Sequence, residues 1–309
     1  MSQDQKNDEL EQTENMVFTK YGKLVPLLRE HILSYAWNST LRNYADCSKY
    51  CNDEIQRFNT IAPEDVVFQQ LDDRIDVLLI YNLISNKNMF SQNKSFLFAE
   101  CPNLMEDICI YISKRYQYVK EGRTRELSIN MKEWPVECIH RLPDVDDLFV
   151  TMYESMLENF IAYANTKQVR KVHLFDSDDH AMTVPSEFFK SRLFRNARVF
   201  RSCVPCEIDT SDFVDSQNSC ITFTCSISFE AIRRKVEMMN AETQNINQSI
   251  EIKLPKDDTR RFDKNVLFPI DRFPNQLDLD EEQLQIGKVE ITVGRKTLVV
   301  KKQHLIGEL

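Results

Sequence analysis

Glycine is scarce in this sequence. The 309 residues include 5 glycines, with none between Gly122 and Gly287, although ordinary usage would supply about 20. Loops that cradle phosphate groups need glycine for close backbone approach and for positive φ. The sequence accordingly contains neither a G-x-G-x-x-G motif nor a P-loop, and G-x-S-x-G and H-E-x-x-H are also missing. These absences exclude the well-marked nucleotide-binding, α/β-hydrolase and metalloprotease motifs, and they favour a non-catalytic binding protein.

A signal peptide and a long apolar run are missing as well. The N-terminal stretch MSQDQKNDELEQTEN is polar, and the longest apolar stretch, 77–84, is interrupted by Asn82. We therefore expect a cytoplasmic or nuclear protein without membrane contact, in which the 9 cysteines are mostly buried thiols. The formal net charge of −9 opposes the phosphate contacts that nucleic-acid binding requires, so no nucleic-acid partner is expected.

The sequence divides into four parts of different character. Residues 1–16 form an acidic tail that is expected to be disordered, 17–60 a short helical module, 61–122 a helical connector, and 123–309 a region of alternating strands and helices. In the connector, Pro63 and two following acids resemble the start of a helix, and apolar residues recur at helical spacing as far as 79. A second connector helix is expected over 103–118.

Residues 123–309 contain a loose repeat. Short apolar-x-apolar strand cores begin at Leu127, Leu148, Val172, Val199, Ile221 and Ile250. Their spacing of 21 to 29 residues matches that of leucine-rich-type units. Helices are expected between them at 154–165, 186–194 and 229–239, the last capped by Ser228, so right-handed crossovers would stack the strands in parallel.

The predicted fold class is therefore α+β or α/β and solenoid-like. It comprises an N-terminal helical module, irregular strand–helix repeats that form a curved sheet with helices on its outer face, and a terminal β-hairpin. The hairpin is indicated by alternating apolar residues over 289–293 and 298–300 around a turn at 294–296. We expect it to cap the end of the sheet.

The segment 24–55, LVPLLREHILSYAWNSTLRNYADCSKYCNDEI, is the most informative part of the sequence. It predicts two short amphipathic helices joined by a turn at 37–39. It resembles an F-box, with matching residues at Pro26, Leu28, Ile32, Leu33, Tyr35, Leu41, Cys47, Ser48, Lys49 and Cys51. It departs from the F-box pattern at Ala36, where the family usually has Leu, at Cys51, where it often has Trp, and at Val25, which displaces the usual Leu-Pro.

The whole chain is similar in character to the expanded nematode F-box families, which carry a C-terminal F-box-associated domain of leucine-rich-like units. This resemblance implies a substrate adaptor of a Skp1–cullin ubiquitin ligase, with no catalytic residue, metal or cofactor of its own, that holds an unknown target protein. It implies contact with a Skp1-type adaptor through Pro26, Leu27, Leu28, Ile32, Leu33 and Leu41. The alternative is an F-box-like scaffold or developmental regulator that binds a partner protein without ubiquitination.

Two groups of basic residues are further candidates for a binding surface. Arginine recurs every three residues at Arg192, Arg195, Arg198 and Arg201, and these side chains could line a basic groove for an acidic target. The basic run 233–235 is expected to cover one exposed face of a helix.

His173, inside a predicted strand, is expected to be a core or rim histidine rather than a ligand.

Four cysteines have a spacing that suggests a metal site. Cys203, Cys206, Cys220 and Cys225 form a C-x2-C-x13-C-x4-C pattern, which resembles a zinc-binding sequence. The x4 spacing and the position of Cys225 within a predicted strand favour buried thiols at strand ends instead. A redox role for the C-x-x-C pair is disfavoured because no helix is predicted to begin at Cys203.

Overall fold

The computed structural model describes residues 47–51, 63–82, 89–116, 124–140, 142, 145–177, 182–241 and 248–302. The acidic tail and most of the F-box-like module, including every residue expected to contact Skp1, lie outside these ranges. The described residues form a mixed α/β structure around one 13-stranded sheet. Within them, every helix is too short or too polar to cross a lipid bilayer.

The centre of the sheet is parallel and follows the order of the chain. Neighbouring parallel strands are β1 (Asp65–Gln70), β4 (Thr124–Asn130), β5 (Val145–Met152), β6 (Lys171–Asp176), β7 (Val199–Cys206), β8 (Cys220–Cys225) and β9 (Ser249–Lys253). All six predicted strand cores lie within β4 to β9, so the prediction of a stack of parallel strands is confirmed.

Antiparallel strands complete the sheet at both edges. At one edge β2 (Arg74–Asn82) pairs with β1, and β3 (Met89–Leu97) pairs with β2. At the other edge β13 (Thr297–Lys302), β12 (Val289–Val293), β11 (Gln283–Ile286) and β10 (Gln276–Asp278) follow β9 in that order. The predicted terminal hairpin is therefore confirmed as β12–β13, and Gly287, with φ of 57°, makes the tight turn between β11 and β12.

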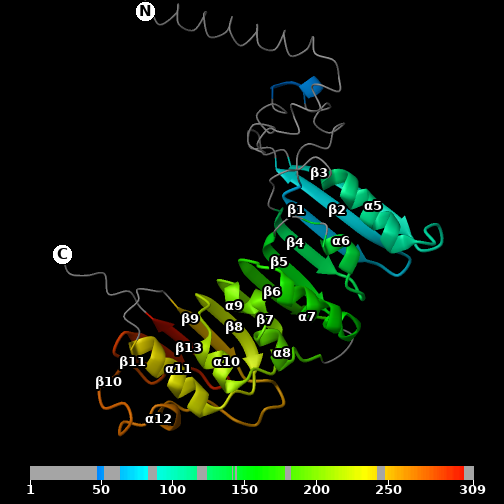
Figure 1. Cartoon of the computed structure of the whole chain (residues 1–309). Coiled ribbons are helices and arrows are strands. Elements are labelled where there is room, and N and C mark those ends of the chain that lie inside the picture. Colours follow the sequence, from blue (N-terminus) through cyan, green and yellow to red (C-terminus); the bar gives the residue numbers. More distant parts are fainter. Residues whose placement is uncertain are drawn as a thin grey trace, which may run out of the picture.

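Helices cross over one face of the sheet between successive strands (Figure 1). They are α5 (Leu104–Tyr116), α6 (Val136–His140), the 3₁₀ turn η1 (Glu154–Met156), α7 (Leu157–Thr166), α8 (Ser186–Phe189), α9 (Arg192–Asn196), α10 (Thr210–Asp215), α11 (Phe229–Ala241) and α12 (Lys264–Leu267). The predicted helix over 186–194 is divided into α8 and α9. The predicted Ser228 cap is confirmed, because its Oγ accepts a hydrogen bond from the Ala231 amide at 3.1 Å.

The predicted helix that begins at Pro63 is wrong, because residues 65–82 form the β1–β2 hairpin. Three of the apolar residues that fit helical spacing, Phe68, Ile75 and Leu79, also fit the alternation of a strand, and they are buried in β1 and β2. The turn at 71–73 is closed by a hydrogen bond of 2.8 Å from the Leu71 amide to the Arg74 carbonyl. The segment predicted to be a helical connector therefore supplies strands to the same sheet as the repeat.

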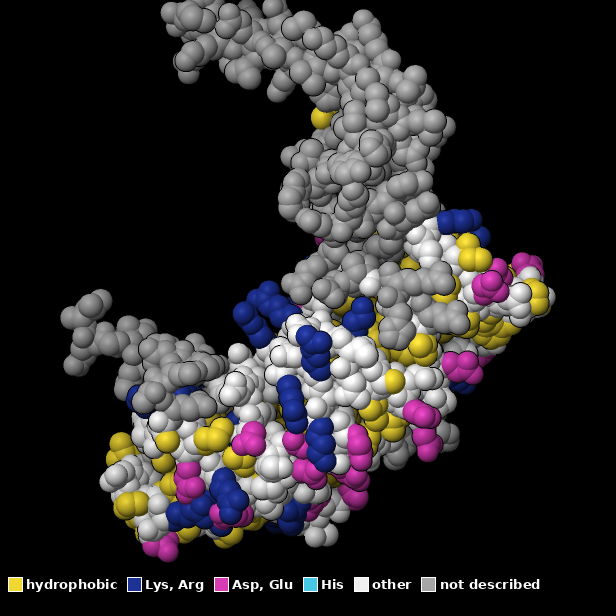
Figure 2. Space-filling model, in the orientation of Figure 1, with side chains coloured by type: hydrophobic (Ala, Val, Ile, Leu, Met, Phe, Trp, Pro, Cys, Tyr) yellow, Lys and Arg dark blue, Asp and Glu magenta, His cyan; other side chains and the backbone are white. Residues whose placement is uncertain are grey.

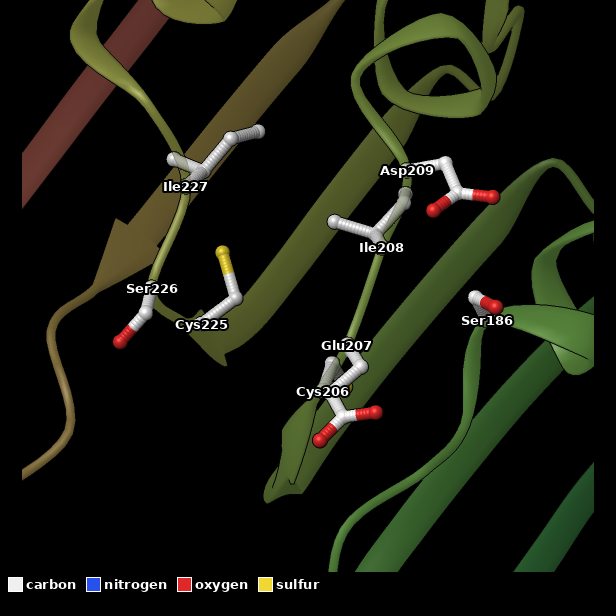
Figure 3. A pocket seen from close by; sticks show the side chains of 8 residues that line it. All are labelled: Ser186, Cys206, Glu207, Ile208, Asp209, Cys225, Ser226 and Ile227. Carbon is white, nitrogen blue, oxygen red and sulfur yellow. The ribbon is translucent and has the colours of Figure 1, made fainter.

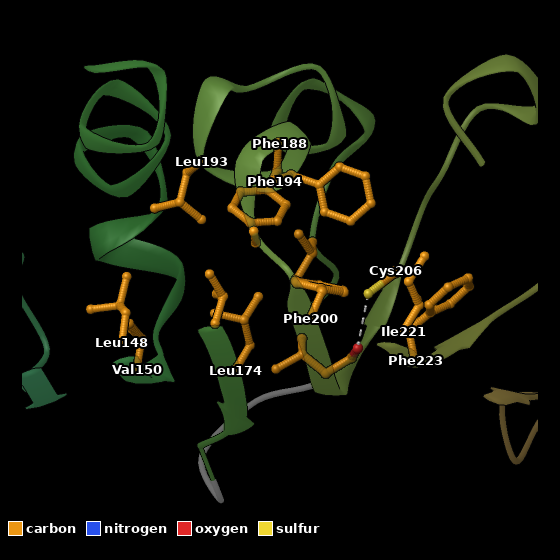
Figure 4. Close-up of a cluster of buried hydrophobic side chains, with 14 of the residues drawn as sticks. Leu148, Val150, Leu174, Phe188, Leu193, Phe194, Phe200, Cys206, Ile221 and Phe223 are labelled. Atoms are coloured by element: carbon orange, nitrogen blue, oxygen red, sulfur yellow. Dashed lines mark hydrogen bonds between the residues drawn. The ribbon is translucent and has the colours of Figure 1, made fainter. Parts of the chain in front are cut away.

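Aromatic side chains form the core beneath α7, α8 and α9. Phe200 of β7 packs against Phe188, Phe189 and Phe194, with ring centroids 5.2 to 5.8 Å apart (Figure 4). The rings of all four are at most 1% exposed. Alternation along β7 places Phe200 on this side of the sheet and directs its neighbour Arg201 to the other side.

Candidate functional site

The described helices all lie on one face of the sheet (Figure 1), and we call the other face the open face. The strand register aligns one residue of each central strand in a row across it: Val67, Ser128, Phe149, His173, Arg201, Thr222, Glu251 and Val299. These side chains are half-buried, except for the exposed Arg201, whereas their strand neighbours on the helical face are mostly fully buried. The open face therefore presents partly accessible side chains of the sheet itself to a partner.

An aromatic cluster lies at the centre of the open face. The rings of Phe149 and His173 are stacked, with centroids 4.5 Å apart and planes 8° from parallel. Phe175 lies two residues beyond His173 on β6, 6.3 Å from Phe149, and 42% of its surface is exposed. Flat aromatic side chains that are partly exposed in this way are typical of the centre of a protein-binding surface.

Charged residues surround the aromatic cluster. Near the starts of β5 and β6, Lys171 forms an ion pair of 2.6 Å with Asp147. Glu126 lies on β4, the next strand beyond β5. Burial raises its pKa, and repulsion from Asp65 raises it further. On the β7 side, Arg201 lies in register with His173, and its side chain makes no hydrogen bond or ion pair with any residue in the described ranges. Arg201 is therefore available to bind an anionic group of a partner.

His173 is held in its neutral form by its surroundings. Burial lowers the pKa of His173 from its ordinary value of 6.5, and the positive charge of Arg201 lowers it further, while Asp147 acts in the opposite direction. A neutral imidazole keeps the stack with Phe149 free of an unpaired buried charge.

This pKa predicts a pH dependence of stability. Because the folded-state pKa of His173 is lowered, its contribution is fully present above 6.5 and is lost as the pH falls through the folded-state value. We expect urea unfolding to show a loss of stability as the pH falls below 6.5, and a smaller loss in a His173→Phe variant, which keeps an aromatic ring but cannot be protonated. Equal pH profiles for the two proteins would contradict the prediction.

The four arginines singled out in the sequence do not share one surface. Arg192 and Arg195 lie on α9, over the helical face, and Arg195 is 3.9 Å from Asp212. Arg198 precedes β7, and Arg201 lies on the open face. The prediction that they line a single basic groove is therefore wrong, although Arg201 remains a candidate for binding a target. On the face of the molecule that Figure 2 shows, basic and acidic side chains are interspersed.

The basic run 233–235 was predicted to cover one exposed face of a helix. This prediction is wrong, because only Arg234 of the three is exposed. Lys235 is 1% exposed, and its Nζ donates hydrogen bonds to the carbonyl oxygens of Val214 and Ser216 at 2.9 and 2.5 Å. Arg233 donates to the carbonyl oxygen of Leu267 at 2.7 Å. These two cations connect α11 to its neighbours α10 and α12. These buried contacts could not be predicted from the sequence, because a charged residue in a helix is usually solvated.

A small pocket lies where β7 and β8 end. It has a volume of about 260 Å³, and its lining includes Ser186, Cys206, Glu207, Asp209, Cys225 and Ser226 (Figure 3). Burial raises the pKa of Cys206 to about 12 and also raises that of Cys225. Both thiols are therefore protonated at neutral pH and are poor nucleophiles. This pocket does not supply the activated thiol that covalent catalysis would need.

The four cysteines of the C-x2-C-x13-C-x4-C pattern do not converge. Cys203 is exposed, whereas Cys206 is buried beside Cys225 in the register of β7 and β8. Cys220 begins β8 and Cys225 ends it, which separates them by about 16 Å in an extended strand. Within the ranges that the structure describes, no three His, Cys, Asp or Glu residues are grouped as a metal site.

Comparison with known proteins gives no assignment: no protein-family model, curated protein or solved structure matches this chain. The function must therefore be inferred from the sequence pattern and from the geometry of the sheet.

Proposed function

We propose that this chain is a non-catalytic substrate adaptor of a Skp1–cullin ubiquitin ligase. The observation that carries the proposal is the F-box-like pattern over 24–55, which precedes a sheet with one open, partly aromatic face. The F-box-like segment would bind a Skp1-type adaptor, and the open face of the sheet would bind the target protein. The irregular strand–helix units would then be leucine-rich-like repeats, and the protein would act in the cytoplasm or the nucleus.

The mechanism of such an adaptor is proximity. A target held on the open face would be kept near the ubiquitin-charged enzyme that the cullin recruits, which raises its effective concentration without any chemistry by this chain. The Phe149–His173–Phe175 cluster would supply apolar contact area, and Arg201 would pair with an acidic group of the target. The protonated thiols of the strand-end pocket are compatible with this absence of chemistry.

The decisive experiment is co-purification with Skp1. Changing both Leu28 and Ile32 to alanine is expected to abolish co-purification, because these apolar side chains would lie at the centre of the adaptor contact. A matched control is His31→Ala, on the same predicted helix, which is expected to leave the interaction intact. Circular dichroism should show the fold unchanged in both variants. Retention of Skp1 by the double variant would overturn the F-box assignment.

The alternative is a scaffold that binds a partner without ubiquitination. The departures from the F-box pattern at Val25 and Ala36 favour it, because they lie in the segment that would contact Skp1. The two functions differ in the fate of the bound protein. Inhibition of cullin ligases should lengthen the lifetime of a target of an adaptor, and should leave the partner of a scaffold unchanged.

A further inference from the structure

Exposed hydrophobic side chains are concentrated at the C-terminal edge of the sheet. Val266, Ile270, Leu277 and Leu279 are 52 to 70% exposed. They make up half of the large hydrophobic side chains that are exposed in the described part of the chain, and all fall within residues 266–279. Such a concentration indicates an interaction surface, whereas single exposed hydrophobic residues do not. We call these four residues the edge patch.

The edge patch is built on an ordered base. Lys264 of α12 connects this helix to the end of β10, because its Nζ lies 3.1 Å from Asp278 Oδ1 and donates to the Asp280 carbonyl at 3.0 Å. Within the same segment of the chain, the rings of Phe268 and Phe273 pack 5.5 Å apart and are buried. The patch therefore lies on fixed elements, which Figure 1 shows together at one end of the molecule.

The strand that carries the patch is open to further pairing. β10 is the last strand of the sheet and pairs antiparallel with β11, with Leu277 opposite Gln285. An edge strand presents backbone groups to which an extended peptide can add as a new strand. The opposite edge differs in composition, since Ser91, Asn93 and Lys94 of β3 are polar and exposed. Among the described side chains of β3 the exposed ones are polar, and a single exposed apolar residue, Phe98, follows that strand, whereas four lie near β10.

The negative charge around the edge patch favours a basic partner segment over a second copy of the chain. Asp271, Asp280, Glu281 and Glu282 are all exposed beside it. A second copy of the chain would bring the same acids against each other, which opposes pairing of two β10 strands. A segment that alternates apolar and basic residues would instead place its apolar side chains on the patch and its cations near these acids.

We propose that the edge patch binds an extended segment of a partner protein, with alternating apolar and basic residues, which adds as a strand to β10. This inference does not depend on the proposed ligase function, since it rests on residues 264–286 alone. It assigns to the chain a second interaction surface, at the edge of the sheet and separate from the aromatic cluster of the open face.

The test is binding of three labelled peptides to the full chain, measured by fluorescence anisotropy. The first has four Lys-Val repeats, the second four Glu-Val repeats, and the third is the Lys-Val peptide with alternate backbone amides methylated. We expect the Lys-Val peptide to bind about tenfold or more tightly than either of the others, because they lose the charge attraction or the strand hydrogen bonds. Equal affinities for the three peptides would overturn the proposal.

Two matched double variants locate the site. Ile270→Ser with Leu277→Ser is expected to weaken binding of the Lys-Val peptide about tenfold. Phe98→Ser with Ile110→Ser changes two exposed hydrophobic residues elsewhere and is expected to have no effect. Equal loss in both variants, or a dimer seen by light scattering that the edge variant abolishes, would contradict the proposal. Skp1 co-purification should be the same in both variants, which separates this test from that of the ligase function.

Discussion

Replacing Phe200 with alanine is expected to lower the free energy of unfolding by about 3–5 kcal/mol. Phe200 is fully buried, and it is the strand residue against which Phe188, Phe189 and Phe194 of α8 and α9 pack. Removing its ring would leave a cavity shared by three other aromatic rings that short helices hold in place. Such a site can collapse only partly, so the cost includes both the lost burial and the cavity.

The matched control for this prediction is Phe175→Ala. Phe175 is also a strand phenylalanine, but it lies on the open face and is 42% exposed. Its loss is expected to change stability by less than about 1 kcal/mol. Urea unfolding followed by circular dichroism would measure both variants. Similar losses of stability would show that the core beneath α8 and α9 is not packed as described.

Replacing Asn218 with alanine is expected to lower the free energy of unfolding by about 2–4 kcal/mol, because it leaves buried carbonyl groups without a donor. Asn218 is 2% exposed, and its Nδ2 donates to the carbonyl oxygens of Phe194 and Ala197 at 2.8 and 2.7 Å. These carbonyls lie at the end of α9, where a helix has no internal donors left. One side chain therefore holds the end of α9 to the loop before β8.

Asn196 provides the comparison for Asn218. Its Nδ2 also donates to a carbonyl of α9, that of Arg192 at 2.9 Å, but on the exposed surface. Water can replace this donor, so Asn196→Ala is expected to cost less than about 0.5 kcal/mol. Thermal unfolding of the two variants would separate the effect of burial from that of the hydrogen bond. A larger cost at Asn196 than at Asn218 would refute the explanation by burial.

The strands from β4 to β9 could be predicted from sequence because each has an apolar-x-apolar core flanked by polar turns. The β1–β2 hairpin could not, since the apolar residues of 66–79 satisfy helical and alternating spacing at the same time. Tertiary pairing with β4 decides between them, and a local pattern does not contain that information. The same ambiguity explains why the connector was predicted to be helical although it contributes β1, β2 and β3.

The candidate site depends on strand register, which the sequence does not specify. Phe149 and His173 are 24 positions apart, and they stack because β5 and β6 align them as direct neighbours. A shift of one residue would move either ring to the helical face. Regular spacing along the chain can also fail to place residues on one surface. The arginines at 192, 195, 198 and 201 are separated in this way, because α9 ends and β7 begins between them.

The agreement between strand order and chain order from β4 to β9 has a consequence for how the protein is made. Each strand from β5 to β9 pairs with the strand that precedes it in the chain, so each unit can dock on a finished neighbour as it leaves the ribosome. The last parallel strand is an exception, because β9 receives its second partner, β13, only after the intervening residues 254–296 have been synthesised. Until then, the growing sheet ends in an unpaired strand, and this interval is when a nascent chain would be most exposed to wrong pairing with other chains.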